Sequence, residues 1–555
     1  MQSSNLLIDQ KVRTQPAIYS KSVRRNHRRI MTSMNAGKMM PLSCIPLLRE
    51  DAVRRSRFNF EFVMAETAES LMNGVRVDLR AYFVSNLAFE RFKGMDDLNA
   101  AYSHTDVINY PLFVDIHKFG GGVQQDEIRP FYQAIGAHAK FSDNVNTAYL
   151  EAYNHVFNHR CKQVSSKIQL RDRLDDTIAP AFWYHTNLRH VVPDFDDASI
   201  EGEISLSIVD AKMPVKGIGV NTNYPASSSE AISLMQSDGT AFRGDGFLST
   251  TSGGNDALIG VSQKIANTHV PDIYAEMKAE GVVVSLANIE LAKKTRAFAE
   301  IRRQYQGVDE EHIIDLLMSG INVPEQALKQ PILLDKSSTV FGHNTRYATD
   351  AGNLEQSVTD GKAYLGLNLR LPPVNTGGVI VITAEVTPEQ MYERIQDPYF
   401  HTLVSTDFPN AQNDALDPQK VTVVNNEYVD TDHNQPDAVF GYAPLNHQWD
   451  RNDAMLGGKF YKNDADAPFD ENRQRIWTNE VVDPQLTEDF YLTSDLHQRV
   501  FASSISDTFE VSGLAEMFIE GNTQFGPALV EATNDYQEII ADVDTSRIGD
   551  PAPDR

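Results

Sequence analysis

Two pairs of histidines have a spacing at which both imidazoles could bind one metal ion. His155 and His159 are four residues apart in a segment with helical periodicity, and His185 and His190 are five apart. Imidazole is a common zinc ligand, but the sequence contains no HExxH motif, in which a Glu between two histidines supplies a general base. Because histidine pairs of this kind are usually hydrogen-bonded structural residues, we predict no metal site and no cofactor.

Other residues that could carry catalysis lack the arrangement that catalysis requires. The acidic segment 462–472, KNDADAPFDEN, lacks the glycine and final glutamate of an EF-hand loop, which favours a solvated acidic loop over a weak calcium site. The glycine-rich segments 119–125 and 216–221 lack the strand and following helix of a phosphate-binding loop. Neither Cys44 nor Cys161 stands in a nucleophile signature, and no GxSxG motif occurs. We therefore predict that the protein is not an enzyme.

A cluster of basic residues near the amino terminus is the strongest charge signal. Residues 1–57 hold twelve Lys or Arg against three acids, although the whole chain has a formal net charge of −26. The densest part, KSVRRNHRR, contains no acid and includes Lys21, Arg24, Arg25, Arg28 and Arg29. Such a segment can bind nucleic-acid phosphates with release of counterions, or it can be a solvated tail. No base-reading motif accompanies it, so we expect any DNA contact to be independent of base sequence.

Length and composition are those of a folded protein made in a reducing compartment. The 555 residues could form several domains or one β domain with large insertions, and the hydrophobic content of 41% is typical of a core-forming protein. No apolar run approaches the roughly 18 residues that would span a bilayer, and the amino terminus has no signal-peptide pattern. The two cysteines are far apart, which argues against a disulfide framework and favours synthesis in the cytosol.

Alternation of apolar and polar residues dominates outside a few helical segments. In 75–83, 203–209 and 365–371 every second residue is apolar, as in strands with one buried face. The segment 379–386 is almost continuously apolar, which indicates a strand covered on both sides. Tens of residues separate these strands, which does not suit a meander or a regular βαβ series. The spacing suits a mainly β fold, a jelly-roll β-sandwich of the kind found in viral coats, with long loop insertions and a few helices.

Two long segments depart from this alternation. Within 285–335 the periodicity predicts a helix over 291–305 and a shorter one over 309–320, and two prolines bracket a part, 324–331, that we predict to be irregular. The segment 210–275 is rich in Gly, Ser and Thr and predicts a surface excursion. We divide the chain into a basic amino-terminal arm (1–57), the first part of the jelly roll with a helical insertion (58–204), a variable surface insertion (205–284), helices with the remaining strands (285–530) and an acidic tail (531–555).

The succession of two helices and the sequence ALKQP within 285–335 resembles the major capsid protein of the Microviridae, tailless phages with single-stranded DNA genomes. Three further stretches fall in the order that this family would have them. They are YLEAYNHVFN (149–158), DIYAEMKAEGVVVSLANIELAK (272–293), and FGYAPLNHQWDRNDAMLGGKF (440–460) followed by QRVFAS (498–503). The similarity runs from about residue 41 to about residue 525, leaving out the region around 205–275.

The resemblance implies a coat protein of the virion that assembles in the bacterial host cytoplasm. Such a protein forms a small T=1 icosahedral shell, a homo-oligomer, around the packaged single-stranded DNA genome. The family implies internal scaffolding and DNA pilot proteins as partners, and contact with the host cell surface through the insertion 205–284. The five basic residues named above would then face the lumen and hold DNA.

Two other interpretations of the sequence stay open. A glycan-binding, lectin-like β-sandwich could bind sugar through the excursion 210–275, but such an extracellular module is expected to have a signal peptide. The second interpretation is an enzyme with an unrecognised pair of catalytic carboxylates. The sequence alone does not say which of its 76 Asp and Glu would lie close enough to form such a pair.

Overall fold

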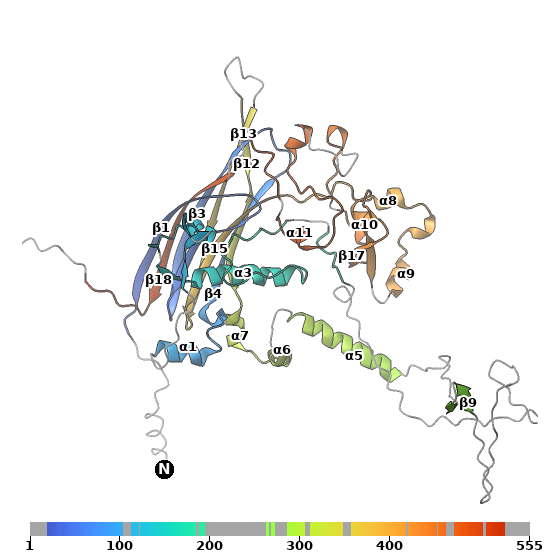
Figure 1. The fold of residues 1–555 in the computed structure, drawn as a ribbon, viewed down its shortest axis with the longest axis horizontal. Helices are drawn as coiled ribbons and strands as arrows, with labels where there is room; N and C mark the ends of the chain where they lie inside the picture. Colours follow the sequence, from blue (N-terminus) through green and yellow to red (C-terminus); the bar gives the residue numbers. More distant parts are fainter. Residues whose placement is uncertain are drawn as a thin grey trace, which may run out of the picture. The chain divides into compact units, whose positions relative to one another are not determined.

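The computed structural model describes residues 19–103, 113–120, 123–141, 143–184, 188–194, 262–265, 268–271, 286–305, 311–347, 357–417, 420–451, 453–461, 471–494, 496–502 and 507–527 (Figure 1). The chain divides into two units, one of Met1–Ser199 with Arg302–Arg555 and one of Ile200–Ile301. The larger unit is mainly β, and each of its sheets is built from antiparallel pairs of strands.

Two sheets form the centre of the larger unit. The six-stranded sheet has the order β1-β18-β3-β13-β12, with β14 also paired to β3, and the four-stranded sheet has the order β11-β4-β15-β2. The strands of the first are β1 (Ser22–Met34), β18 (Phe509–Gly521), β3 (Asp51–Thr67), β13 (Ser357–Leu367), β12 (Gly342–Tyr347) and β14 (Leu371–Val374). Those of the second are β11 (Ile332–Val340), β4 (Val75–Ser85), β15 (Gly378–Pro388) and β2 (Met39–Leu47).

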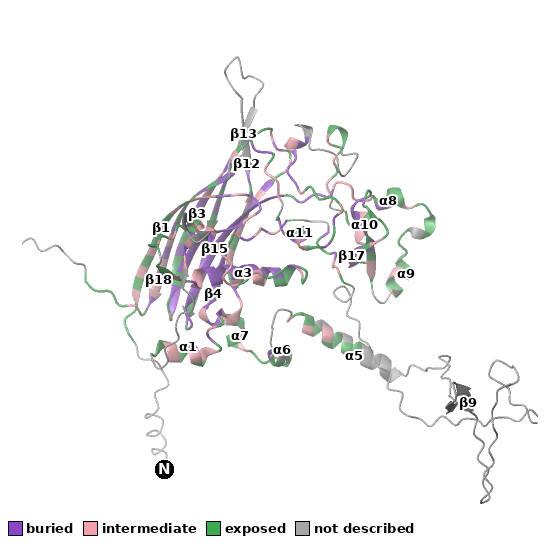
Figure 2. Ribbon diagram, in the orientation of Figure 1, coloured by how far each residue is buried: buried purple, intermediate pink, exposed green. Residues whose placement is uncertain are grey.

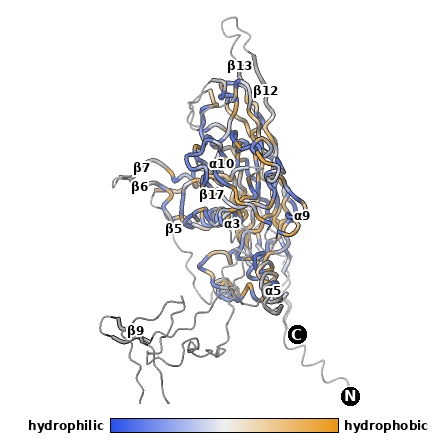
Figure 3. Tube along the Cα trace, turned by 90° about the vertical axis from the view of Figure 1, so that its right-hand side faces the viewer, coloured by the Kyte–Doolittle hydropathy of each residue, from blue (hydrophilic) through white to orange (hydrophobic). Residues whose placement is uncertain are grey.

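The two sheets share one hydrophobic core. Hydrophobic and hydrophilic stretches are mixed along the trace (Figure 3), and buried and exposed residues alternate along much of β3 and β18, so each of these strands has an apolar face to bury. On β3 that face is Phe58, Phe60 and Phe62, each at most 2% exposed, and on β4 it includes Val77 and Leu79. These side chains belong to a single buried cluster to which both sheets contribute, as expected when two sheets pack face to face.

Strands β4, β15 and β2 of the four-stranded sheet are largely buried on both faces (Figure 2), whereas its edge strand β11 is mostly exposed or half-buried. All 11 residues of β15 are buried, which confirms the prediction of a strand covered on both sides at 379–386. Its second face packs against helix α3 (Ala148–Val164), whose buried residues include Tyr153 and Phe157, in a second hydrophobic cluster. The hydroxyl of Tyr153 donates to the carbonyl oxygen of Met39 at 2.6 Å, which fixes the helix to the edge strand β2.

Shorter elements fill the connections between the strands. The helices are α1 (Met95–Tyr102), α2 (Pro130–Ala134), α6 (Glu311–Met318), α7 (Pro324–Lys329), α8 (Pro398–His401), α9 (Ala411–Leu416), α10 (Asn426–Val429) and α11 (Glu488–Tyr491), with 3-10 turns at η1 (Asn86–Ala88), η2 (Ser405–Asp407), η3 (His447–Trp449), η4 (Gly458–Phe460) and η5 (Glu471–Arg475). Paired short strands are β5 (Phe113–Asp115) with β8 (Asn144–Asn146), β6 (His117–Gly120) with β7 (Val123–Ile128), and β16 (Val421–Asn425) with β17 (Val439–Pro444). None of the described helices is both long and apolar enough to cross a membrane.

The amino-terminal part departs from the prediction of a basic arm over 1–57. Residues 1–18 lie outside the described part of the chain, but β1, β2 and the first half of β3 account for most of 22–57, so the arm is wrong there. The boundary at residue 58 falls inside β3. The pattern was misleading because β1 is an edge strand with few apolar side chains, although Ile30 and Met34 pack on the core.

The predictions for 285–335 and for the insertion are partly met. Helices α5 (Leu286–Arg303) and α6 occupy the two segments predicted to be helical. The irregular part at 324–331 is wrong, because α7 begins at Pro324, where the fixed φ of proline suits a first helical position. In the second unit the described part of the excursion 210–275 is a pair of short strands, β9 (Ser262–Ile265) and β10 (Thr268–Pro271). The predicted strand at 203–209 and the tail 531–555 lie outside the described residues.

Candidate nucleic-acid interface

The five predicted DNA-contacting residues lie on or beside the edge strand β1. Lys21 precedes the strand and is exposed, and the other four belong to it. Successive side chains of a strand point to opposite faces, so the four arginines do not share one surface. Arg28 is opposite Ala515, a core residue, whereas Arg25 is opposite Phe518 on the outer face of the six-stranded sheet.

Strand pairing adds arginines from β3 to this outer face. Arg25, Phe518 and Arg55 lie in one cross-strand row. His27, Glu516 and Arg57 lie in the next. A shift of register between Phe518 and Ile519 leaves an extra residue, Arg54, which is also exposed, as is usual at a β-bulge. We call this surface the basic patch, and its residues are Arg25, His27, Arg29, Arg54, Arg55 and Arg57.

Two acids neutralise only part of the basic patch. Arg25 pairs with Glu516 at 2.6 Å and Arg54 pairs with Glu520 at 2.6 Å. The hydrogen bond from Arg54 lowers the pKa of the Glu520 carboxyl, so this acid stays ionised over the ordinary pH range. Arg29, Arg55 and Arg57 form no ion pair with any residue that the structure describes, and all three are exposed. The patch therefore has an excess of positive charge in a chain that is acidic as a whole.

Arg24 has a structural role that the sequence does not reveal. Its Nη1 donates to Oδ1 of Asp51 at 2.9 Å, and the side chain of Asp51 is 0% exposed. Asp51 also accepts a hydrogen bond from the backbone N–H of Leu48. The guanidinium compensates a buried carboxylate, which gives Arg24 a structural role beside the DNA contact predicted for it.

The missed residues Arg55 and Arg57 had a sequence signal. The alternation of Phe58, Phe60 and Phe62 places the residues between them, and by extension Arg57 and Arg55, on the opposite, solvent-facing side of the same strand. The sequence does not show that β18 pairs with both β1 and β3, from which it is separated by more than 400 residues. This pairing brings the arginines of β1 and those of β3 together.

The histidines considered as metal ligands make hydrogen bonds within the chain. Nε2 of His155 lies 3.0 Å from the carbonyl oxygen of Lys329, and Nε2 of His159 lies 2.9 Å from the amide of Gln163. Burial lowers the pKa of His159, so its imidazole is neutral at pH 7. Among the described residues no cluster of three or more His, Cys, Asp or Glu could hold a metal ion. His185 and most of the acidic segment 462–472 lie outside the described residues.

A second surface feature is apolar. In the segment 398–416, which we call the apolar loop, Phe400 is 79% exposed and Leu403 is 88% exposed. The loop is held in place, because Asp397 caps α8 by accepting hydrogen bonds from the backbone N–H groups of Tyr399 and Phe400, and it forms an ion pair with Arg451. Hydrogen bonding to the backbone of Phe400, with the contact to Arg451, lowers the pKa of Asp397. Large exposed apolar side chains on an ordered loop are typical of a surface that binds another protein.

Comparison with known proteins leaves the family open. A scan against models of protein families found no match, and a search of curated protein sequences found none. The two surfaces themselves indicate what the chain can bind. Arginines on the flat face of a sheet can bind phosphates without reading bases, and the apolar loop can bury its side chains against a second protein.

Proposed function

We propose that this chain is the major coat protein of a microvirus-like phage, which assembles into a closed T=1 icosahedral shell around single-stranded DNA. The observation that carries the proposal is the order of the strands in the two facing sheets. Eight of them form two antiparallel sets, β1-β18-β3-β13 and β2-β15-β4-β11.

This order supports a jelly roll. Consecutive strands alternate between the two sheets from β1 to β4, and they alternate again from β13 through β15 to β18. Only the step from β4 to β11 remains within one sheet. Such alternation is expected when a pair of antiparallel ribbons is wrapped into a sandwich of eight strands, the architecture of many viral capsid proteins and of some lectins.

The two surfaces favour a shell around DNA over a glycan-binding module, because a shared fold does not fix function. A closed shell requires each subunit to offer several different contact surfaces. The apolar loop lies in the long connection between Pro388 and Phe509, and its exposed Phe400 and Leu403 suit burial against a neighbouring subunit. A glycan site does not need such a surface.

The basic patch supports the genome-facing part of the proposal. Packaged phosphates would meet repulsion from an acidic chain unless a local basic surface faces them. Arg29, Arg55 and Arg57 offer charges that no described carboxylate neutralises. The same proposal includes internal scaffolding and DNA pilot proteins as expected partners. It also includes contact of the insertion 205–284 with the host cell surface, and the virion as the location of the protein.

Assembly is the direct test. The full chain, co-expressed with the phage scaffolding protein or recovered from virions, should elute as closed particles in size-exclusion chromatography with light scattering, and negative-stain microscopy should show shells. The double variant Phe400→Asp and Leu403→Asp should remain folded by circular dichroism but stop at monomers or small oligomers. Met72→Asp, at an exposed apolar residue outside the apolar loop, is the matched control and should still assemble. A stable wild-type monomer under conditions in which the scaffolding protein is present would refute the proposal.

A further inference from the structure

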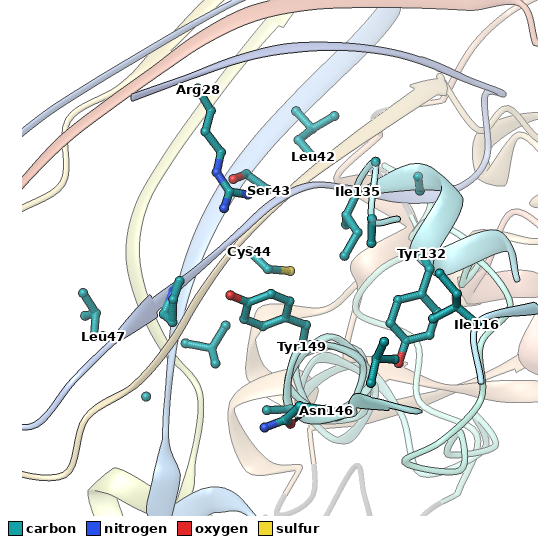
Figure 4. A pocket seen from close by; sticks show the side chains of 18 of the residues that line it. Arg28, Leu42, Ser43, Cys44, Leu47, Ile116, Tyr132, Ile135, Asn146 and Tyr149 are labelled. Atoms are coloured by element: carbon teal, nitrogen blue, oxygen red, sulfur yellow. Dashed lines mark hydrogen bonds between the residues drawn. The ribbon is translucent and has the colours of Figure 1, made fainter. Parts of the chain in front are cut away.

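A large cavity opens between the edge strands β1 and β2 (Figure 4). Residues of α1, of α2 and of the start of α3 complete its wall. Its volume is about 1390 Å³, whereas pockets for drug-sized molecules have roughly 300–1,000 Å³. Protein interiors are normally close-packed, so a space of this size has room for a large ligand.

The floor of the cavity is apolar. Five of the side chains that form it, each at most 5% exposed, are Leu42, Cys44, Phe92, Leu98 and Ile116. A hydrocarbon chain on this floor is stabilised in proportion to the apolar area that it removes from water. A nucleobase is less suited to the floor, because the polar groups on its edges would lose water without gaining hydrogen-bond partners. The floor therefore favours a ligand with hydrocarbon chains.

The charged residues around the cavity are all basic. Those that line it within the described part of the chain are Arg28, Arg29, Arg49 and His138, with no Asp or Glu among them. Arg28 and Arg29 are exposed and so stand at the mouth. Arg49 donates to the backbone oxygen of Asn375 at 2.6 Å and to the side-chain oxygen of Asn99 at 2.7 Å, both of which are uncharged. The mouth therefore favours a ligand with a negatively charged group.

Arg28 connects the charged mouth to the apolar floor. It lies opposite Ala515, a core residue, and its side chain extends over Ser43 and Cys44 (Figure 4). Burial raises the pKa of the Cys44 thiol to about 12, and the charge of Arg28 opposes this rise, so the guanidinium is close enough to act on the floor. Charged and apolar groups meet in the same way in an amphiphile, where a head group is joined to hydrocarbon chains. Guanidinium groups bind phosphate through paired N–H donors.

Two buried hydroxyls of the cavity point independently to a ligand with oxygen acceptors. Ser43 is 4% exposed and Tyr132 is 3% exposed, and neither hydroxyl has a hydrogen-bond partner among the described residues. Burial raises the pKa of Tyr132 to about 12, so its hydroxyl is neutral and can donate a hydrogen bond. Buried polar groups in native proteins are nearly always hydrogen-bonded, and both of these line the cavity.

We propose that the cavity between β1 and β2 binds one anionic phospholipid, with its acyl chains on the apolar floor and its phosphate beside Arg28 at the mouth. Two acyl chains suit a volume larger than that of a drug-sized pocket. The phosphate oxygens can accept hydrogen bonds from Arg28 and Ser43, and an ester carbonyl can accept one from Tyr132. Basic pockets beside apolar surface recognise the head groups of anionic lipids in the same way.

Titration of the full-length, delipidated protein with soluble short-chain lipids tests the proposal. Isothermal titration calorimetry should show that dioctanoyl phosphatidylglycerol, which is anionic, binds at one site per chain. It should bind at least about tenfold more tightly than dioctanoyl phosphatidylcholine, whose head group has no net charge. Equal affinities for the two lipids would overturn the assignment of an anionic ligand. Glycerol phosphate, which has no acyl chain, should not bind measurably, and an affinity equal to that of phosphatidylglycerol would overturn the role of the apolar floor.

Charge variants test the role of the arginines at the mouth. The double variant Arg28→Gln and Arg49→Gln should lower the affinity for phosphatidylglycerol at least about tenfold and leave that for phosphatidylcholine unchanged. The matched control is the double variant Lys336→Gln and Arg370→Gln, which removes two exposed charges that do not line the cavity. It should leave both affinities unchanged. Equal losses in the two double variants would overturn the assignment of the phosphate to this mouth.

Filling the cavity provides a test that does not depend on charge. Ala101 of α1 is half-buried and lines the cavity, so Ala101→Trp should place a large side chain in the space of the acyl chains. This variant should keep the circular dichroism spectrum of the wild type and lose binding of both lipids. Unchanged binding of phosphatidylglycerol in the folded variant would overturn the site. A short oligothymidylate should not displace the lipid from the wild-type protein, and displacement would assign the cavity to nucleic acid instead.

Discussion

Arg160 of helix α3 and Glu385 of strand β15 form a buried ion pair across 225 residues of sequence. Their side chains are 6% and 4% exposed, and Nη2 of Arg160 donates to Oε2 of Glu385 at 3.0 Å. The guanidinium also lies 4.1 Å from the ring centroid of Phe182. The pair connects the helix to an inner strand of the four-stranded sheet, so the packing of α3 on that sheet includes two buried charges that must stay paired.

The substitution Glu385→Gln should lower the free energy of unfolding by about 3–5 kcal/mol, because it leaves the Arg160 guanidinium buried without a counter-charge. Urea denaturation followed by tryptophan fluorescence is the measurement. The exposed pair of Arg25 and Glu516 provides the control, and Glu516→Gln should cost no more than about 1 kcal/mol. Equal effects of the two substitutions would contradict the view that burial makes the inner pair important.

The same pair should make stability depend on acid pH. Burial acts to raise the pKa of Glu385, but the charge and hydrogen bond of Arg160 outweigh this and lower it. A carboxyl with a lowered folded-state pKa contributes stability that is fully present above its unfolded pKa, about 4.3, and is lost as pH falls through the folded value. The difference in unfolding free energy between wild type and Glu385→Gln should therefore be constant near neutral pH and shrink below about pH 4. A difference that stays constant down to pH 3 would count against this assignment.

A strand could be predicted from the sequence where the pattern of its own apolar residues shows which of its faces are buried. The segments that became β4 and β15 were identified because their apolar residues face a core on one side or on both. Strand β1 was missed because its outer face meets solvent and part of its inner face meets the cavity, where Arg28 stands in place of an apolar residue. The pattern of apolar residues along a strand reflects which side chains are buried, and an edge strand such as β1 buries few of them.

The candidate site shows a different limit. Basic residues near the amino terminus could be counted from the sequence, but which of them are available could not. Arg24 is committed to Asp51, and Arg55 and Arg57 join the patch only through the pairing of β3 with β18. Such long-range strand pairing is set by the whole fold, and no local pattern encodes it.

Gly513 of β18 should not tolerate a side chain. An added Cβ would lie 2.2 Å from Cδ1 of Phe60, a core residue that is 2% exposed. We expect Gly513→Ala to lower the free energy of unfolding by about 1–3 kcal/mol through overpacking, measured by urea denaturation. Gly457→Ala is the control, because no atom lies within 4 Å of its added Cβ, and it should change stability by less than about 0.5 kcal/mol. A neutral Gly513→Ala would show that β18 can move away from β3 at little cost.

Removing the unpaired charges of the basic patch should weaken DNA binding without affecting the fold. In the triple variant Arg29→Gln, Arg55→Gln and Arg57→Gln the core is untouched, because all three side chains are exposed. Each lost phosphate contact should reduce the slope of log K against log salt by about 0.7 for single-stranded DNA, so three contacts should reduce it by about 2. Fluorescence anisotropy with an oligonucleotide over a range of salt concentrations measures this slope. Binding should weaken to the same degree for oligonucleotides of different sequence, since phosphate contacts carry no base information.

The contrasting variant is Arg24→Gln. It should destabilise the fold by about 3 kcal/mol, because it leaves Asp51 buried and unpaired. The salt slope of DNA binding by the folded variant should stay as in the wild type. An unchanged slope in the triple variant would contradict the assignment of DNA binding to the basic patch.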